Sequence, residues 1–147
     1  MLKYKIKTFE DLTTTELYKL LKLRSEVFVV EQDCVYQDID GKDDKALHVL
    51  GYKGKKLVAY TRIFEPGYYF EASSIGRVVV AKNEREHKYG YELMETSIEA
   101  IRIHFKETKI KISAQYHLKK FYNNLGFKEV GDTYLEDDIP HIAMFRS

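Results

Sequence analysis

The most constraining stretch of this sequence runs from Ile75 to Phe105, where an apolar run, a polar turn and a long amphipathic segment follow one another. The β-branched run Ile75–Ala81 has the length and composition of a buried strand. After the turn, apolar residues recur at helical spacing, at Leu93, Met94, Ile98, Ile101 and Phe105. The pattern predicts a strand that leads directly into a long helix.

The turn reads Arg85, Glu86, His87, Lys88, Tyr89 and Gly90, and Tyr91 follows it. The first backbone N–H groups of a helix have no partner inside the helix, and the helix dipole adds positive potential there. Such an end favours an anion, typically phosphate. We therefore predict a phosphorylated cofactor held mainly by the backbone of Arg85–Tyr91. An ordinary strand–loop–helix connection is the alternative, because a turn with one glycine is weakly specific.

Length and composition bound the class of protein. A chain of 147 residues suits one core, so we expect a single domain over residues 1–147. The 24 basic and 23 acidic side chains nearly cancel, which argues against nucleic acid as the main partner. No apolar run approaches the ~20 residues of a membrane helix, so no membrane association is expected. The alternating start is a strand pattern and not a signal peptide. With the single cysteine Cys34, no internal disulfide can form, and the cytoplasm is the expected location.

The rest of the chain alternates strands and helices. We expect strands at residues 3–9, 46–52, 56–64, 109–114, 127–130 and 141–145. A helix over residues 14–30 should begin with a capping box formed by Thr13 and Glu16. A further helix after residue 115 should end at Gly126. The order β-α-β-β-β-α-β-α-β-β predicts one α/β domain around a mixed sheet.

Several polar residues allow two interpretations each. Residues 31–44 carry six carboxylates and one lysine, and form either solvated surface or one wall of a pocket for a cationic amine. The spacing fails for a calcium loop, because Tyr36 and Leu47 stand where ligands are required, and we expect no metal. Arg24, on an apolar helix face, either pairs with a carboxylate or binds a ligand. His48, inside a strand, is either structural or part of a site.

Taken together, these features resemble the GNAT superfamily of N-acetyltransferases, and more narrowly its ElaA-like branch. The valine-rich strand runs into an Arg-led turn and a long helix, and a later helix carries Phe121-Tyr122 and ends in Leu125-Gly126-Phe127. The likeness covers nearly the whole chain, with further support at residues 23–32, 75–78, 112–115 and 136–141. It implies a mixed, mostly antiparallel sheet that is splayed at its central strand. It also implies helices on both faces and acetyl-CoA in the gap.

The resemblance implies roles for residues around acetyl-CoA. The backbone of Val78 and Val80 would pair with the pantetheine arm, and the pyrophosphate would lie on the turn Arg85–Gly90. Lys88 stands where the family usually has a glycine, which permits positive φ and close backbone approach. A lysine ammonium could offset that loss by reaching a phosphate. Gln115 stands where many members have asparagine beside the pantetheine.

The implied reaction is direct transfer of an acetyl group from a thioester to a primary amine of a small molecule or peptide. The amine must lose a proton, the oxyanion must be stabilised and the departing thiolate must be protonated. Tyr122 matches the family's general acid, and a backbone N–H at Val78 or Val79 would polarise the thioester carbonyl.

The general base and the acceptor pocket are less specified by the sequence. The candidate bases are Glu31, His48, Asp137 and His141, with a water relay as a further alternative, and we retain Glu31 and His141. The expected acceptor pocket consists of Glu31, His48, Arg77, Asp137 and His141. Arg77 is interpreted as a residue that orients the pocket, and Cys34 as a free thiol.

An alternative function is a catalytically weak acyl-CoA-binding module that senses acyl-CoA or docks a partner. Lys88 in the turn and the lack of an acidic base on the central strand favour it. An open sheet edge would also allow two copies to pair into a homodimer.

Overall fold

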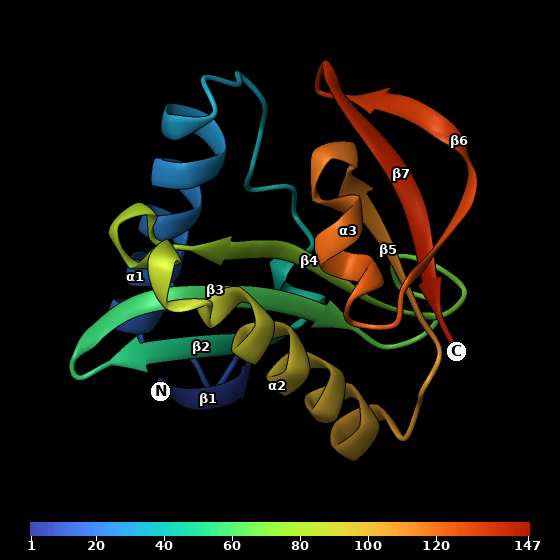
Figure 1. Cartoon of the computed structure of the whole chain (residues 1–147). Coiled ribbons are helices and arrows are strands. Elements are labelled where there is room, and N and C mark those ends of the chain that lie inside the picture. Colours follow the sequence, from blue (N-terminus) through green and yellow to red (C-terminus); the bar gives the residue numbers. More distant parts are fainter.

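The computed structural model describes all residues, 1–147, and contains one seven-stranded mixed sheet with helices on both faces (Figure 1). The strands are β1 (Lys3–Thr8), β2 (Leu47–Lys53), β3 (Lys56–Phe64), β4 (Ser73–Val80), β5 (Ile110–Gln115), β6 (Lys128–Glu136) and β7 (Ile139–Arg146). They lie in the order β1-β2-β3-β4-β5-β7-β6, and only the β4–β5 pair is parallel. The expected mixed, mostly antiparallel α/β sheet is confirmed.

Three α-helices flank the sheet: α1 (Thr14–Arg24), α2 (Tyr89–Phe105) and the short α3 (Lys119–Asn123). The expected capping box starts α1, because Thr13 Oγ1 accepts from the Glu16 N–H at 3.0 Å and Glu16 Oε1 accepts from the Thr13 N–H at 2.9 Å. The helix expected to reach residue 30 changes type on the way and continues as a π-helix over Ser25–Glu31. No helix has both the length and the apolar character needed to cross a membrane.

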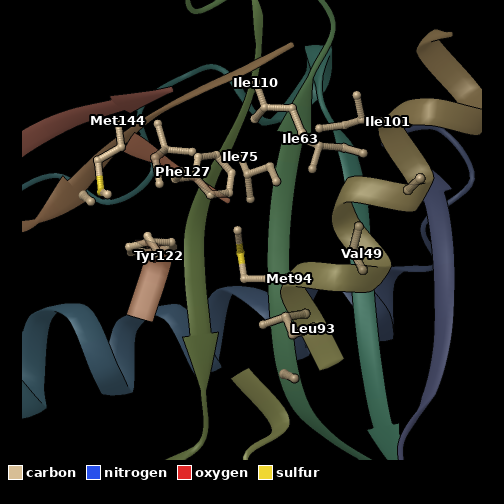
Figure 2. Packing of buried hydrophobic residues seen from close by; sticks show 14 of the residues in the cluster. Val49, Ile63, Ile75, Leu93, Met94, Ile101, Ile110, Tyr122, Phe127 and Met144 are labelled. Carbon is tan, nitrogen blue, oxygen red and sulfur yellow. The ribbon is translucent and has the colours of Figure 1, made fainter. Parts of the chain in front are cut away.

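Each face of the sheet has its own apolar layer. On one face α1 and the π-helix contribute Leu20, Leu23 and Val27, which pack against Leu50, Tyr60 and Val79. On the other face α2 directs Leu93, Met94 and Ile101 at the strands (Figure 2). The larger cluster continues past β4 to Tyr122, Phe127 and Met144. One core therefore joins β1–β4 to β5–β7.

The sheet is splayed between β4 and β5. These strands pair only at Ser73 with Ile110 and at Ser74 with Lys111, although both continue beyond those residues. In Figure 1 the strands β1–β4 run across the view, whereas β5 and β7 stand steeply in it, in opposite directions. The splay implied by the resemblance is therefore present, and it leaves most of one edge of β4 without a strand partner.

A β-bulge in β4 accompanies the splay. Against β3, Arg62 pairs with Gly76 and Tyr60 with Val79, so two residues of β4 face one residue of β3. One of the two is Arg77, whose φ is +51°. A bulge bends and further twists its strand, so β4 turns away from β5 just beyond their last common pair. Gly76, directly before Arg77, was the one local sign of the bulge, because a glycine inside a strand often marks such a site.

The predicted C-terminal strands were too short. Residues 136–140 were expected to separate two strands, but β6 continues to Glu136 and β7 begins at Ile139. The intervening Asp137 and Asp138 have φ values of +51° and +64°, as in a two-residue hairpin turn. All nine residues of β6 are exposed, so the strand lacks the apolar alternation on which the prediction relied.

Candidate active site

A cavity of about 140 Å³ lies in the splay, between the end of the π-helix, β4 and the β5–β7 strands. Six of the predicted site residues line it: Arg77, Val78, Gln115, Tyr122, Asp137 and His141. Aromatic rings form much of the rest of its wall, from Phe28, Tyr36, Phe64, Tyr69 and Phe70. Predicted site residues that do not line it are Glu31, His48, Val80 and the turn residues Arg85 to Tyr91.

The backbone of β4 offers hydrogen-bonding groups on its open edge. The Ala81 N–H donates to the Val58 carbonyl of β3 at 2.7 Å. Successive residues of a strand direct their N–H and C=O groups to opposite sides. Val79 therefore also faces β3, whereas Val78 and Val80 face the gap beside β5. The carbonyl of Val80 accepts a bond from Arg85 Nε at 3.1 Å, which fits this direction. Of the two residues considered for polarising a carbonyl, Val79 pairs with Tyr60 of β3, whereas Val78 lies in the bulge and lines the cavity.

Tyr122 reaches the cavity from α3. Its ring packs edge-on against Phe121 and Phe127, with centroid distances of 5.0 and 6.0 Å. The residue is only 6% exposed, and its hydroxyl has no hydrogen-bond partner in the protein. Burial raises the pKa of Tyr122 above its usual range. The hydroxyl is therefore a protonated donor at neutral pH, and it faces a cavity that can supply an acceptor.

The turn before α2 has the conformation that the glycine of the family would provide. Lys88 adopts φ +59° and ψ +28°, the left-handed region that glycine enters most easily. No side chain caps the N-terminus of α2. The Tyr91 N–H donates to the Lys88 carbonyl at 3.2 Å, and the N–H groups before it can receive an anion. Gly90 is needed for close packing, because a Cβ there would lie 3.3 Å from the Phe121 ring.

Glu31 lies beside this turn and not in the cavity. Its carboxylate receives both terminal nitrogens of Arg85, with Nη2 at 2.8 Å from Oε1. These hydrogen bonds from Arg85 hold the pKa of Glu31 below its usual range. A carboxylate with a lowered pKa is a weaker base, so Glu31 is the poorer of our two retained base candidates.

The acidic segment 31–44 is solvated surface only in part: Glu31, Asp33 and Asp44 are exposed, and the other three carboxylates are buried or half-buried. Its Asp38, Asp40 and Asp43 bind three arginines that come from α1, β3 and β4, namely Arg24, Arg62 and Arg77. We call these six residues the Arg–Asp cluster. Arg24 is 0% exposed and Arg62 is 1% exposed. The carboxylate interpretation of Arg24 is therefore correct, and the cluster fastens the acidic segment against the sheet.

The arginines of the cluster keep Asp40 and Asp43 charged. Burial alone would raise the pKa of Asp43, but hydrogen bonds from Arg24 at 2.7 Å and from Arg62 at 3.0 Å bring it below its usual range. Burial would likewise raise the pKa of Asp40, but hydrogen bonds from two nitrogens of Arg62 lower it. Asp38 accepts from Arg24 Nε at 2.8 Å, Arg77 Nε at 2.7 Å and the Tyr36 hydroxyl at 2.9 Å.

His48 is placed in the interior and not in the cavity. It is 0% exposed, its Nδ1 bonds the Tyr60 hydroxyl, and its Nε2 lies 2.9 Å from the Asp43 carbonyl. Burial lowers the pKa of His48 below its usual range. Both ring nitrogens are occupied by protein groups, so the structural interpretation of this residue holds and its assignment to the acceptor pocket does not.

His141 stands at the cavity on β7. Its Nδ1 lies 2.7 Å from the carbonyl of Ile139, and a carbonyl can only accept, so Nδ1 carries a proton. In the neutral ring Nε2 then has the free lone pair, 3.5 Å from Glu136 Oε2. Ser113 bonds the Tyr134 hydroxyl close by, and Tyr134 stacks on the His141 ring with 6.2 Å between centroids. These neighbours hold the imidazole in one orientation, with Nε2 beside Glu136, which also lines the cavity.

The fold and this arrangement of groups can be compared with known proteins. The family model described as an acetyltransferase (GNAT) domain matches residues 10–146. The chain is 45% identical to Protein ElaA of Escherichia coli (strain K12) over 138 residues, which is 92% of this chain and 90% of that protein.

The chain belongs to the GNAT acetyltransferase family.

Three further comparisons agree with this membership. The structure superposes on a crystal structure of an acyl-CoA N-acyltransferase from Pseudomonas aeruginosa with a TM-score of 0.94 and 42% identity, over 100% of both chains. The crystal structure of E. coli ElaA gives a TM-score of 0.93, also with 42% identity over 100% of both chains. UPF0039 protein C11D3.02c of Schizosaccharomyces pombe is 40% identical over 97% of this chain and 95% of that protein. The predicted ElaA-like resemblance is confirmed.

Sequence reasoning missed part of this GNAT site. Arg62 and the aromatic wall from Phe28 to Phe70 were not predicted, because they come together only through the splay and the bulge. One signal was available: Arg62 stands in the apolar strand Leu57–Phe64, where a charged side chain requires a buried partner.

The Arg–Asp cluster yields a stability prediction. Asp43→Asn should lower the free energy of unfolding by about 3 kcal/mol, because two buried guanidinium groups then share one carboxylate fewer. Glu31→Gln is the matched control and should cost less than about 1 kcal/mol, because its pair with Arg85 is partly exposed. Urea unfolding monitored by circular dichroism measures both. Equal losses in the two variants would contradict the structural role of the cluster.

The left-handed conformation of Lys88 yields a second stability prediction. A non-glycine residue there costs roughly 1–2 kcal/mol, and glycine costs about 0.5–1 kcal/mol of extra chain entropy. Lys88→Gly should therefore raise the free energy of unfolding, by up to about 1 kcal/mol. Lys106→Gly, at φ +57° after α2 and away from the cavity, is the control and should behave alike. Thermal unfolding of both variants provides the test, and a lower stability of Lys88→Gly alone would refute this account of the turn.

Proposed function

We propose that this chain transfers the acetyl group of acetyl-CoA directly to a primary amine of a small molecule or peptide. The observation that carries the proposal is the open edge of β4 at Val78 and Val80, which faces the same gap as the unpartnered hydroxyl of Tyr122. Family membership and the acyl-CoA N-acyltransferase fold support acyl-CoA chemistry in general. The acetyl group, the amine acceptor and the residue roles are our assignment.

The residues present fit acetyl-CoA. The amides of a pantetheine arm can pair with the backbone of Val78 and Val80 as a neighbouring strand would. The uncapped N-terminus of α2 and the turn from Arg85 to Tyr91 can receive the diphosphate. Arg85 would exchange Glu31 for a phosphate oxygen, and Gln115 lines the cavity on the opposite side of the gap.

Acetyl-CoA supplies an activated acyl group, and the protein supplies positions for charge and protons. We assign the Val78 N–H to the thioester oxygen, where it stabilises the negative charge that develops during attack. The amine nitrogen forms the new bond to the acetyl carbon, and its surplus proton passes to His141 Nε2. The carbon–sulfur bond breaks, and the Tyr122 hydroxyl protonates the departing sulfur. One proton is taken and one is given, so the net charge of the site is unchanged.

His141 is the better base of the two candidates. It lines the cavity, and the bond from Nδ1 to Ile139 leaves Nε2 as the basic nitrogen. Glu31 lies outside the cavity, and its carboxylate is engaged by Arg85. A base must reach the proton that it removes, which favours His141.

The first test is titration of the purified protein with acetyl-CoA in a calorimeter, followed by CoA release over a panel of primary amines. We expect dissociation constants in the micromolar range or below and release of CoA with at least one amine. Binding without CoA release from any amine would favour the alternative, an acyl-CoA-binding module. No binding at millimolar acetyl-CoA would overturn both functions.

The second test is Tyr122→Phe. The substitution removes only an unpartnered hydroxyl, so it should leave thermal stability and acetyl-CoA affinity nearly unchanged. Turnover should fall by about 100-fold or more, as for loss of a general acid. Tyr116→Phe, on the exposed turn before α3, is the control and should retain turnover. If Tyr122→Phe turned over acetyl-CoA as fast as the unchanged protein, Tyr122 would not be the acid.

A further inference from the structure

The charges around the cavity differ between its two sides. On the side of β3 and β4 the lining cations are Arg62 and Arg77. Arg62 is held by Asp40 at 2.7 and 2.8 Å and by Asp43 at 3.0 Å, and its Nε is buried without a hydrogen-bond partner. Arg77 donates to the Asp38 carboxylate at 2.7 Å and to the Asp38 backbone carbonyl at 3.0 Å, and it approaches the Asp40 carboxylate at 3.4 Å. Across the whole Arg–Asp cluster, three positive charges meet three negative ones, so no cation is left over.

On the β6–β7 side the balance is negative. Glu136 and Asp137 line the cavity at the hairpin turn, and no lysine lines it. The only cationic partner of Glu136 is His141, whose Nε2 lies 3.5 Å from Glu136 Oε2. This imidazole carries a positive charge only when it is protonated. Asp137 makes no salt bridge; its backbone carbonyl accepts a weak bond from Cys34 at 3.5 Å. An acceptor in this cavity meets surplus negative charge and matched arginines.

The wall between these two sides is apolar, and one polar group in it is unsatisfied. Phe28, Phe64 and Phe70 contribute aromatic surface that suits a hydrocarbon chain or ring. The Tyr122 side chain lines the same space, and the residue is only 6% exposed. Its hydroxyl has no hydrogen-bond partner in the protein. The cavity therefore suits a ligand with an apolar body and one polar, positively charged end.

From this arrangement we infer that the acceptor is a primary amine on an apolar chain or ring with no carboxylate next to the amine. The inference rests on the proposed function and names the substrate class of that site. An ammonium group is attracted by Glu136 and Asp137, releases one proton to solvent and then reacts as the neutral amine. A carboxylate beside the amine would face the same two anions, and burying it would leave its charge without a free cation to pair with.

The test compares amines with the amino acids that differ from them only by a carboxylate. The pairs are 2-phenylethylamine with phenylalanine, tyramine with tyrosine, and isoamylamine with leucine, each assayed by acetyl-CoA-dependent CoA release. We expect kcat/KM to be at least about tenfold higher for the amine in each pair, the effect of roughly 1.4 kcal/mol. Equal or higher kcat/KM for the amino acids would overturn the substrate class and leave acetyl transfer itself standing.

A matched pair of turn variants tests the electrostatic cause. Asp137 lines the cavity and Asp138 does not, although both have positive φ in the same turn. Asparagine tolerates that conformation, so Asp137→Asn and Asp138→Asn both keep the hairpin. Asp137→Asn should raise the KM of the amines and narrow the amine-to-amino-acid ratio several-fold, whereas Asp138→Asn should leave the ratio unchanged. Identical ratios in both variants would overturn the role of the acidic side.

Different results would contradict the substrate class and the acetyltransferase function. If acetyl-CoA binds and other amines release CoA, but neither member of any pair does so, the substrate class falls and the acetyltransferase function stands. If acetyl-CoA does not bind, the proposed function falls with it.

Discussion

Only two residue pairs join strands β1–β4 to strands β5–β7, namely Ser73 with Ile110 and Ser74 with Lys111. The geometry of the site depends on the early end of this pairing. Beyond Ser74 and Lys111, β4 and β5 diverge, and the bulge at Arg77 bends β4 away. The divergence creates both the cavity and the free edge of β4. Arg77 belongs to the Arg–Asp cluster, so the bulge is tied through Asp38 and Asp40 to a segment far away in the sequence. A buried ionic network thus helps to fix a backbone irregularity that the site requires.

Local signals in the sequence were sufficient for the elements that carry strong periodicity. The strand into α2, the helix to Phe105, the capping box at Thr13 and the glycine after α3 were all predictable, because propensity, spacing and capping chemistry agree there. Gly126 has φ +91°, as its predicted position after the helix requires. The fold class also followed from the order of elements and from the resemblance to GNAT proteins.

Features set by tertiary contacts were beyond that reasoning. The fully exposed β6 has no apolar pattern, and its turn uses two aspartates where glycine or asparagine would be the usual sign. The partners of the acidic segment lie on three different elements, so no spacing in the sequence identifies them. The π-helix after α1 has the same residue types as an α-helix, and a pattern cannot distinguish the two. Likewise, Lys88 keeps the left-handed backbone of a glycine although its residue type argues against it.

The split in the sheet coincides with a division of the chain into two consecutive pieces. Strands β1–β4 come from residues 3–80, and β5–β7 come from residues 110–146. Apart from the two backbone pairs, side chains such as Tyr122, Phe127 and Met144 join the pieces within one core. The angle between the pieces is therefore set by the sizes of packed side chains rather than by strand hydrogen bonds. Substitutions at these core positions would adjust the width of the gap, and with it the bulk of the acyl group that fits, without touching a residue of the chemistry.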